Sequence, residues 1–271
     1  IKTLAIKKPF LFSTTRLKEF DFMHVHEGRS GLLALCVNYI YKVPYLITRR
    51  IPNMPRENYL TQLKYKKARL IVSLSHKIDE VMKSYQIKSE FKVIPSMARK
   101  LIADFEQVKL LKENYQDRFL IGHVGALSQH HKNQGLIIDA ARKLQEEEKN
   151  IHFLLVGSGI DEAILKERAK GLDNITFVGQ KKDIANYYAL FDLFVYPSFE
   201  EGLGSSILEA FSFRLPVFAA NRDGIPDIIT HGENGYLVEP NDVDTFVRYI
   251  LDIYENEEKR ENLAEQAFES L

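Results

Sequence analysis

The sequence predicts an α/β fold of parallel sheets wound with helices, because short apolar runs alternate with amphipathic helical patterns along the chain. The 271 residues exceed one average domain but are short for two complete ones, and the 45% hydrophobic content is ample for a core. Residues 1–116 carry 22 Lys and Arg against 10 Asp and Glu, whereas residues 117–271 carry 15 against 27. This charge split favours two domains, with a boundary between Pro95 and Asp117.

Each predicted strand is a short apolar run that ends at polar or turn-forming residues. The first half contains four such runs, at Phe22–His26, Tyr45–Thr48, Leu70–Leu74 and Phe91–Ile94. The second half contains six, at Phe119–Val124, His152–Val156, Ile175–Val178, Leu193–Tyr196, Val217–Ala219 and Tyr236–Val238. Helical patterns separate these six near residues 135–148, 160–170, 183–190, 205–213 and 242–255. We therefore expect a partial N-terminal domain over 1–97, a linker over 98–116 and a complete domain over 117–271.

The segment Tyr196–Ala220 carries the strongest indication of a ligand site. A strand ends in Pro-Ser, a glycine-bracketed turn follows, and a helix then opens on two serines. Glycine lets the backbone approach a ligand closely, and the free N–H groups of a helix start suit an oxyanion or sugar hydroxyls. Similar turns occur throughout α/β proteins, where a neighbouring glutamate is more often solvated than bound to a ligand. The candidate residues are Glu201, Gly202, Gly204, Ser205, Ser206 and Glu209.

This segment resembles the Glu-x7-Glu signature of retaining GT-B glycosyltransferases of family 4, the glycosyl transferases group 1. Glu201 and Glu209 match its two glutamates and Pro216–Val217 matches its end, whereas Arg214 and Leu215 replace its usual small residue and glycine. The resemblance covers nearly the whole chain. It implies two Rossmann-like, doubly wound domains that face a cleft, with the donor held mainly by the second. It also implies a partial chain, because the family's opening strand, glycine-rich loop and C-terminal crossing helix are not found.

The stretch after Val124 places a lysine between a predicted strand and a helix start. Such a lysine neutralises a diphosphate together with the helix N–H groups, although on its own it would more often be an exposed loop residue. The stretch resembles the family's G-R-L…K loop, which assigns donor binding to Gly125 and diphosphate binding to Lys132. Ala126 replaces the usual arginine. The diphosphate then receives less positive charge, or another group such as His131 supplies it.

Two further groups of residues follow predicted strands. His24 and His26 alternate onto one face of a strand, but no third and fourth ligand of suitable spacing appears, so we expect no metal site. The strand end resembles the family's D-x-x-H-x-H pattern, which makes His26 a catalytic candidate at the donor sugar or acceptor and His24 a structural residue. Arg49 and Arg50 end the next strand at the same sheet edge, either for an anionic acceptor or as solvated side chains.

The nucleotide side of the site is expected at two later strand ends. Gly157-Ser158-Gly159 is a G-x-G without its third glycine, which is a weak dinucleotide fingerprint. Within the resemblance, Gly157 lines the nucleotide and the backbone around Gln180 meets the base. Asp192 and Asp227 are expected to be structural.

Together these features predict a retaining glycosyltransferase that moves a hexose from a nucleotide diphosphosugar, most simply a UDP-sugar, to a glycan or lipid-linked glycan in surface polysaccharide or glycoconjugate synthesis. By the resemblance, Glu201 acts at the donor sugar, Glu209 holds the ribose, and no cofactor or metal is required. One alternative is a non-hydrolysing sugar-nucleotide epimerase of the same fold. A second is a non-catalytic sugar-nucleotide-binding module. A third, an NAD-dependent oxidoreductase, is disfavoured by the missing third glycine.

Location is inferred from composition. No apolar stretch is long enough to span a bilayer, and the single cysteine fits a reducing cytoplasm. Cys36 sits in the apolar run Gly31–Tyr41, so we expect it to be buried. The basic half predicts reversible contact with an anionic membrane surface at the cytoplasmic face, and nucleic acid is not an expected partner. Attraction between the oppositely charged halves is the alternative role for its basic cluster, Lys64, Lys66, Lys67 and Arg69.

Overall fold

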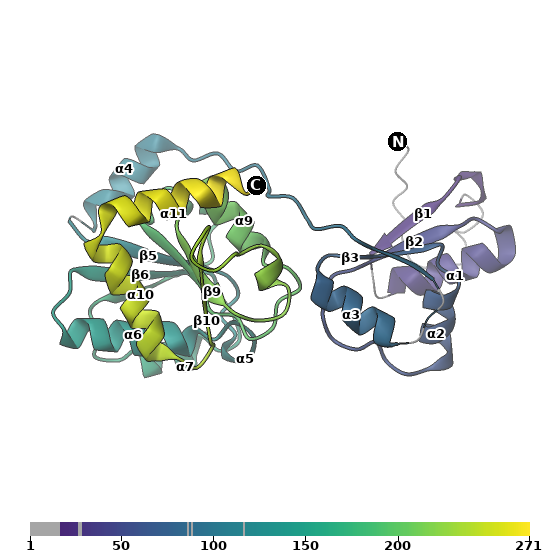
Figure 1. The fold of residues 1–271 in the computed structure, drawn as a ribbon, viewed down its shortest axis with the longest axis horizontal. Coiled ribbons are helices and arrows are strands. Elements are labelled where there is room, and N and C mark those ends of the chain that lie inside the picture. Colours follow the sequence, from purple (N-terminus) through teal and green to yellow (C-terminus); the bar gives the residue numbers. More distant parts are fainter. Residues whose placement is uncertain (1–16, 27–28, 86, 88, 116) are drawn as a thin grey trace. The chain divides into compact units, whose positions relative to one another are not determined.

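The computed structural model describes residues 17–26, 29–85, 87, 89–115 and 117–271. It divides the chain into two compact units, Ile1–Pro95 and Ser96–Leu271, each with one sheet of parallel strands and helices packed on it (Figure 1). Within the described residues, every helix is too short or too polar to span a lipid bilayer.

Over its described residues, the first unit contains a four-stranded parallel sheet whose spatial order follows the sequence, β1-β2-β3-β4. All four predicted strands are confirmed, as β1 Met23–His26, β2 Tyr45–Arg49, β3 Leu70–Ser73 and β4 Glu90–Val93. The connecting helices are α1 Arg29–Tyr41, α2 Tyr59–Lys66 and α3 His76–Ser84. Asn58 and Ser75 begin α2 and α3, because their side chains accept the N–H groups of Thr61 and Ile78.

Helix α1 shows that the predicted burial of Cys36 was wrong. The apolar run Gly31–Tyr41 is helical, and helical periodicity turns only one side of it toward the sheet. Ala34 and Val37 are fully buried, whereas Cys36 lies on the exposed side. The thiol is therefore at the surface of the first unit.

The second unit contains a six-stranded parallel sheet in the order β10-β9-β8-β5-β6-β7. All six predicted strands are confirmed, as β5 Phe119–Val124, β6 Ile151–Val156, β7 Ile175–Gly179, β8 Leu193–Tyr196, β9 Val217–Ala220 and β10 Tyr236–Val238. Read from β7 and renumbered from β5, this order is the 3-2-1-4-5-6 of a doubly wound Rossmann sheet. The strand order reverses between β5 and β8, which pair through Ile121 opposite Leu193.

Helices connect these strands and end the second unit. Five of them correspond to the predicted helices: α6 Gln134–Glu146, α7 Glu162–Arg168, α8 Ile184–Tyr188, α9 Ser205–Ser212 and α10 Val243–Glu255. Three more, which the sequence analysis did not assign, are α4 Phe105–Glu113, α5 Gln129–Lys132 and α11 Glu257–Glu269, and a 3-10 turn, η2 Ile225–Asp227, follows β9.

Helix α4 lies in the stretch 98–116 that was predicted to be a linker. Asp104 begins this helix by accepting the N–H groups of Glu106 and Gln107, and its own N–H donates to Asn186 Oδ1 at 2.7 Å. The helix packs on α8, and Leu111 joins an apolar cluster of the second unit. The stretch is therefore part of that unit, to which Leu101, Leu111 and Tyr115 attach it, whereas Phe105 and Leu110 are exposed.

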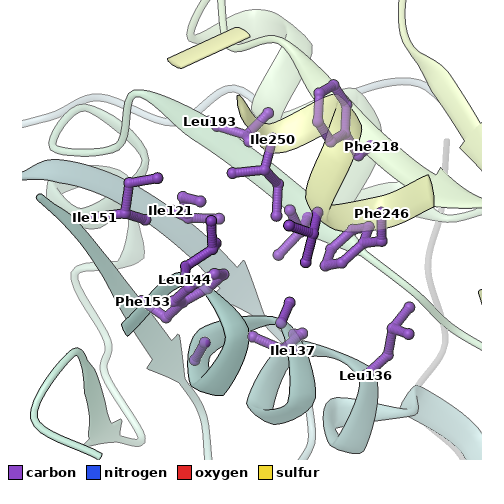
Figure 2. Close-up of a cluster of buried hydrophobic side chains, with 14 of the residues drawn as sticks. Ile121, Leu136, Ile137, Leu144, Ile151, Phe153, Leu193, Phe218, Phe246 and Ile250 are labelled. Carbon is purple, nitrogen blue, oxygen red and sulfur yellow. The ribbon is translucent and has the colours of Figure 1, made fainter. Parts of the chain in front are cut away.

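Two apolar clusters, one on each face of the six-stranded sheet, hold the second unit together. Neighbouring residues of one strand enter opposite clusters, as Leu120 and Ile121 of β5 do. In the cluster of Figure 2, helices α6 and α10 cover one face, where Ile137, Phe153 and Ile250 have no exposed surface. Burial of such a side chain contributes about 1.5–3 kcal/mol. The packed sheet fixes where the loops at its C-terminal edge lie.

Candidate functional site

The loops that follow β5 and β8 lie side by side, because these two strands are neighbours at the point where the strand order reverses. Ligands of open α/β sheets bind at this point, outside the C-terminal ends of the strands. Backbone bonds join the two loops, since Phe199 N–H donates to His131 O at 2.9 Å. The His131 ring also lies near Glu200, with Nδ1 3.2 Å from Oε2. His131, which could supply positive charge in place of the arginine missing at position 126, thus has the Glu200 carboxylate beside it.

Helix α9 begins at this edge with its first N–H groups uncapped by any side chain. Gly204 takes the N-cap position with φ 93°, in the left-handed region that favours glycine. A Cβ there would lie 2.9 Å from Ile207 Cδ1. Ser205 and Ser206 form the first turn. An uncapped helix start carries a partial positive charge and free donors, so it suits a phosphate or sugar oxygens.

Lys132 and Glu201 meet on one side of this helix start. Lys132 Nζ lies 2.5 Å from Glu201 Oε2 and 2.8 Å from Tyr196 Oη. Tyr196 Oη donates to the same Glu201 oxygen at 2.6 Å. Burial raises the pKa of Tyr196 well above its usual value, and the Glu201 charge adds to the effect, so the phenol keeps its proton. The backbone of Glu201 is also fixed, because its N–H donates to Asp223 Oδ2 at 3.0 Å.

Glu209 lies one turn further along α9 and is 11% exposed at its side chain. Its Oε2 accepts a hydrogen bond from Tyr188 Oη at 3.1 Å, and its Oε1 lies 3.3 Å from Arg99 Nε. Burial raises the Tyr188 pKa, with the Glu209 charge as the second cause, so this phenol also remains a donor. Two carboxylates, each held by a tyrosine and a cation, therefore flank one open helix start.

A pocket of about 270 Å³ lies at the C-terminal ends of β5 and β6 and is lined by Gly125, Gly157 and Gln180 among others. Three predicted donor-binding residues thus meet in one pocket. Gly157 has φ 147°, and a Cβ on it would lie 1.9 Å from Gly125 O, so only glycine fits where the two loops pack backbone to backbone. Gly202 is buried in the turn before α9. Ligand pockets usually start at about 300 Å³, so this one suits a single ring such as a nucleobase.

His123 lies within β5 and has no exposed surface. Its Nδ1 donates to Val195 O at 3.0 Å, so Nε2 is the acceptor and receives the Gln134 amide at 3.3 Å. The ring stacks on Tyr196 with centroids 5.9 Å apart. Burial is the main cause that lowers the His123 pKa to about 4, and the nearby Lys132 charge lowers it further. A neutral imidazole therefore supports the tyrosine that holds Lys132 and Glu201.

Because folding lowers the His123 pKa from about 6.5 to about 4, we expect the free energy of unfolding to fall as pH drops through this range. The unfolded chain binds a proton there that the folded chain does not. The slope reaches at most about 1.4 kcal/mol per pH unit for one such group. Urea unfolding at pH 7, 5.5 and 4.5 measures the change, and His123→Asn should flatten it. Equal slopes for both proteins would show that the His123 imidazole is not the titrating group. The slope that remains in His123→Asn is expected to come from His152, whose pKa is also lowered to about 4.

The first unit holds the remaining candidates. His26 is exposed at the end of β1, with its ring centroid 4.5 Å from that of His24, and His24 Nε2 lies 2.7 Å from Thr48 Oγ1. Arg49 is buried with Nη1 3.2 Å from Tyr65 Oη, beside a pocket of about 730 Å³. Over the described residues, no group of three or more His, Cys, Asp or Glu side chains is placed to hold a metal ion.

Several residues of the site escaped the sequence analysis. Tyr188 and Tyr196 were counted as apolar strand or helix residues, and Arg99 stood in the predicted linker. His123 is a polar residue inside an otherwise apolar strand, which was a usable signal. Asp192 was expected to be structural and is confirmed, since its Oδ2 accepts the Leu120 N–H at 2.7 Å.

The fold defines a class, that of α/β proteins with a Rossmann-like sheet, and the candidate site lies at the switch point of that sheet. The chain belongs to the glycosyl transferases group 1 family, because the sequence model of that family matches residues 104–270. The chain is 24% identical over 225 residues to the N-acetyl-alpha-D-glucosaminyl L-malate synthase of Bacillus anthracis. This alignment covers 80% of this chain and 58% of that protein. The chain is also 24% identical over 286 residues to the alpha-monoglucosyldiacylglycerol synthase of Acholeplasma laidlawii, covering 93% and 71%. The chain spans about half the length of the first curated relatives it matches.

Solved structures show the same fold. Anabaena Alr3699/HepE in complex with UDP superposes with a TM-score of 0.85 at 21% identity, covering 96% of this chain and 76% of that chain. The pneumococcal O-GlcNAc transferase GtfA, in complex with UDP and GlcNAc, gives 0.77 at 16% identity, covering 96% and 56%. The fold is that of the GT-B glycosyltransferases, as predicted.

Proposed function

We propose that this chain forms the donor-binding part of a retaining glycosyltransferase that moves a hexose from a nucleotide diphosphosugar to a hydroxyl group of a glycan or lipid-linked glycan. One observation carries the proposal: the buried Glu209 and the partly buried Glu201, each with its own cation, flank an uncapped helix start at the switch point of a Rossmann-like sheet. Such an arrangement suits a ligand that combines an anion with several hydroxyl groups.

The proposal gives the donor one orientation. The base enters the pocket lined by Gly157 and Gln180, the ribose hydroxyls donate to Glu209, and the diphosphate meets Lys132 and the start of α9. Glu201 then lies at the sugar and stabilises the positive charge that develops at the anomeric carbon. The bond from this carbon to the diphosphate oxygen breaks. A bond to the acceptor oxygen forms on the same face, and the acceptor proton passes to the departing diphosphate.

UDP is the nucleotide we propose, because two structurally similar proteins, HepE and GtfA, were solved with it. The curated relatives include sugar transferases for a small carboxylic acid and for a lipid, and a capsular polysaccharide biosynthesis glycosyltransferase of Staphylococcus aureus. We place this chain in surface glycan or glycolipid synthesis. His26 is the proposed residue of the first unit that acts near the sugar or the acceptor. No cofactor or metal is needed in this scheme, since a lysine and a helix start neutralise the leaving group.

The donor is tested by thermal unfolding of the chain with UDP-, GDP- and ADP-sugars. A ligand that binds the folded state raises stability by RT ln(1 + [L]/Kd), so the true donor should stand out. No shift with any of them would overturn the proposal. Turnover of a UDP-sugar to its epimer without an acceptor would favour the epimerase, and binding without transfer or hydrolysis in the intact protein would favour the binding module.

Lys132→Ala should weaken binding of the nucleoside diphosphate much more than binding of the nucleoside. A lysine at a helix start acts mainly on phosphate charge, and loss of one charged hydrogen bond costs about 1.5–3 kcal/mol, roughly ten- to hundredfold in affinity. Calorimetry with both ligands measures the contrast, and Lys170→Ala, an exposed lysine on the same unit, is the matched control. Equal losses for both ligands would mean that Lys132 supports the loop and not the phosphates.

The basic cluster of the first unit is the basis for a second proposal, reversible contact with an anionic membrane. Lys66, Lys67 and Arg69 are exposed, whereas Lys64 is buried with Nζ 4.3 Å from the Tyr65 ring centroid, so three of the four cations face outward. Each contributes about 1 kcal/mol near an anionic leaflet at low salt. We expect co-sedimentation with anionic vesicles at 20 mM salt that a Lys66→Glu/Lys67→Glu variant loses. Equal recovery on neutral vesicles would leave a water-soluble acceptor as the better proposal.

A further inference from the structure

Arg99 makes an unexpected contact with Glu209, the residue predicted to hold the ribose. It follows β4 by a few residues, in an irregular segment between the two sheets, and belongs to the second unit. Its Nε lies 3.3 Å from Glu209 Oε1, while its side chain is 62% exposed and that of Glu209 is 11% exposed. An exposed cation therefore covers the one carboxylate oxygen that Tyr188 does not use.

The charges around the helix start balance in pairs. Lys132 pairs with Glu201 and Arg99 pairs with Glu209, so the four side chains sum to zero. A carboxylate as buried as Glu209 is costly without a compensating charge, and Arg99 supplies that charge. A donor diphosphate adds about two negative charges to this balanced set of side chains. It is bound well only if the cations can turn from the carboxylates to the phosphates.

The loop after β5 offers one cation for that purpose, Lys132, because position 126 is alanine. The start of α9 adds a partial charge of about one half. Glu209 lies four residues along α9 from Ser205, which is about 6 Å at 1.5 Å per residue. Arg99, which contacts Glu209, is thus within one side-chain length of a phosphate bound at the start of α9. Its segment has no helix or strand bonds that would resist a small shift.

We propose that Arg99 is a donor-binding residue that neutralises Glu209 until the donor binds, and that it turns to the donor diphosphate when the ribose hydroxyls replace it on Glu209. The inference rests on the proposed function, since it assumes a nucleotide diphosphosugar. Ribose binding and the movement of Arg99 are then coupled. The remaining guanidinium N–H groups supply the second phosphate contact.

The test measures calorimetric affinity for the best nucleoside diphosphate among UDP, GDP and ADP, and for its nucleoside. Arg99→Ala should weaken the diphosphate by roughly tenfold, the loss of one charged hydrogen bond, and leave the nucleoside equal or tighter because a competitor for Glu209 is gone. Lys100→Ala removes the same charge from the adjacent exposed residue and should change neither. Arg99→Lys keeps the charge and should restore part of the loss.

Each other outcome has its own meaning. Tighter binding of both ligands to Arg99→Ala would make Arg99 a simple plug and overturn the inference. Equal weakening of both would make it a support of the loop, which also overturns it. A difference no larger than that of Lys100→Ala would reduce it to a surface charge. No nucleotide binding by the unsubstituted chain would overturn the proposed function itself, and the inference with it.

Discussion

Replacing Glu209 with alanine is expected to lower the affinity for a nucleotide diphosphosugar by roughly two orders of magnitude or more. A buried carboxylate that accepts two ribose hydroxyls loses two charged hydrogen bonds, each of about 1.5–3 kcal/mol. The carboxylate is already in position before the ligand arrives, since Tyr188 holds Oε2 at 3.1 Å and the side chain is 11% exposed. Little further ordering is then needed on binding. Calorimetry with the donor measures the loss.

Two comparisons make the Glu209 result specific. Glu200→Ala removes the same charge from a half-exposed side chain in the neighbouring turn and should leave the affinity nearly unchanged. The nucleoside alone should lose as much affinity as the sugar nucleotide, because the missing contacts are to the ribose. This is the opposite of the pattern expected for Lys132→Ala. Unchanged nucleotide affinity would remove Glu209 from the site.

The sequence predicted the strands of this chain well because each is a short apolar run with clear ends. Strands β5, β8 and β10 were predicted and found with the same bounds. Helices were predicted where an apolar stripe recurs, as in α6. They were missed where charge dominates, as in α11, or where apolar residues surround the helix, as in α1, whose exposed side carries Cys36. Periodicity identifies a helix only when its two sides differ.

The site was predicted in part for a related reason. Gly125, Gly157 and Gln180 lie after different strands, and the resemblance assigned all three to the donor. They line one pocket because parallel strands end at one edge of the sheet. The partners of the two glutamates needed more. Tyr196 is 64 residues from Lys132 along the chain, and Tyr188 is 89 residues from Arg99. Only the folded sheet brings each pair together. A tyrosine in an apolar run predicts core packing, and its hydroxyl function becomes visible only with its neighbours in place.

The Lys132–Glu201 pair is the clearest instance of what the sequence left open. The resemblance gave these residues separate tasks, one at the diphosphate and one at the sugar. The structure places Lys132 Nζ 2.5 Å from Glu201 Oε2, with Tyr196 bonded to both. The lysine must therefore leave the carboxylate, at least in part, to serve the phosphates. Charge at Glu201 then opposes donor binding while it favours the positive charge of the reacting sugar, so binding and rate should respond in opposite directions to its removal.

Glu201→Gln is accordingly expected to slow breakdown of the donor by roughly 10²–10³-fold, the usual cost of removing one preorganised group that stabilises transition-state charge. Affinity for the donor should stay the same or rise, because the amide keeps the shape and the bond to Tyr196 but no longer competes for Lys132. Release of nucleoside diphosphate under saturating donor gives the rate, and calorimetry gives the affinity. Tyr196→Phe is the matched comparison, since it removes a hydrogen bond from both partners and leaves the Glu201 charge, so it should affect the rate far less. A Glu201→Gln protein with reduced affinity and an unchanged rate at saturation would make Glu201 a binding residue, and the positive charge at the anomeric carbon would then need another stabilising group.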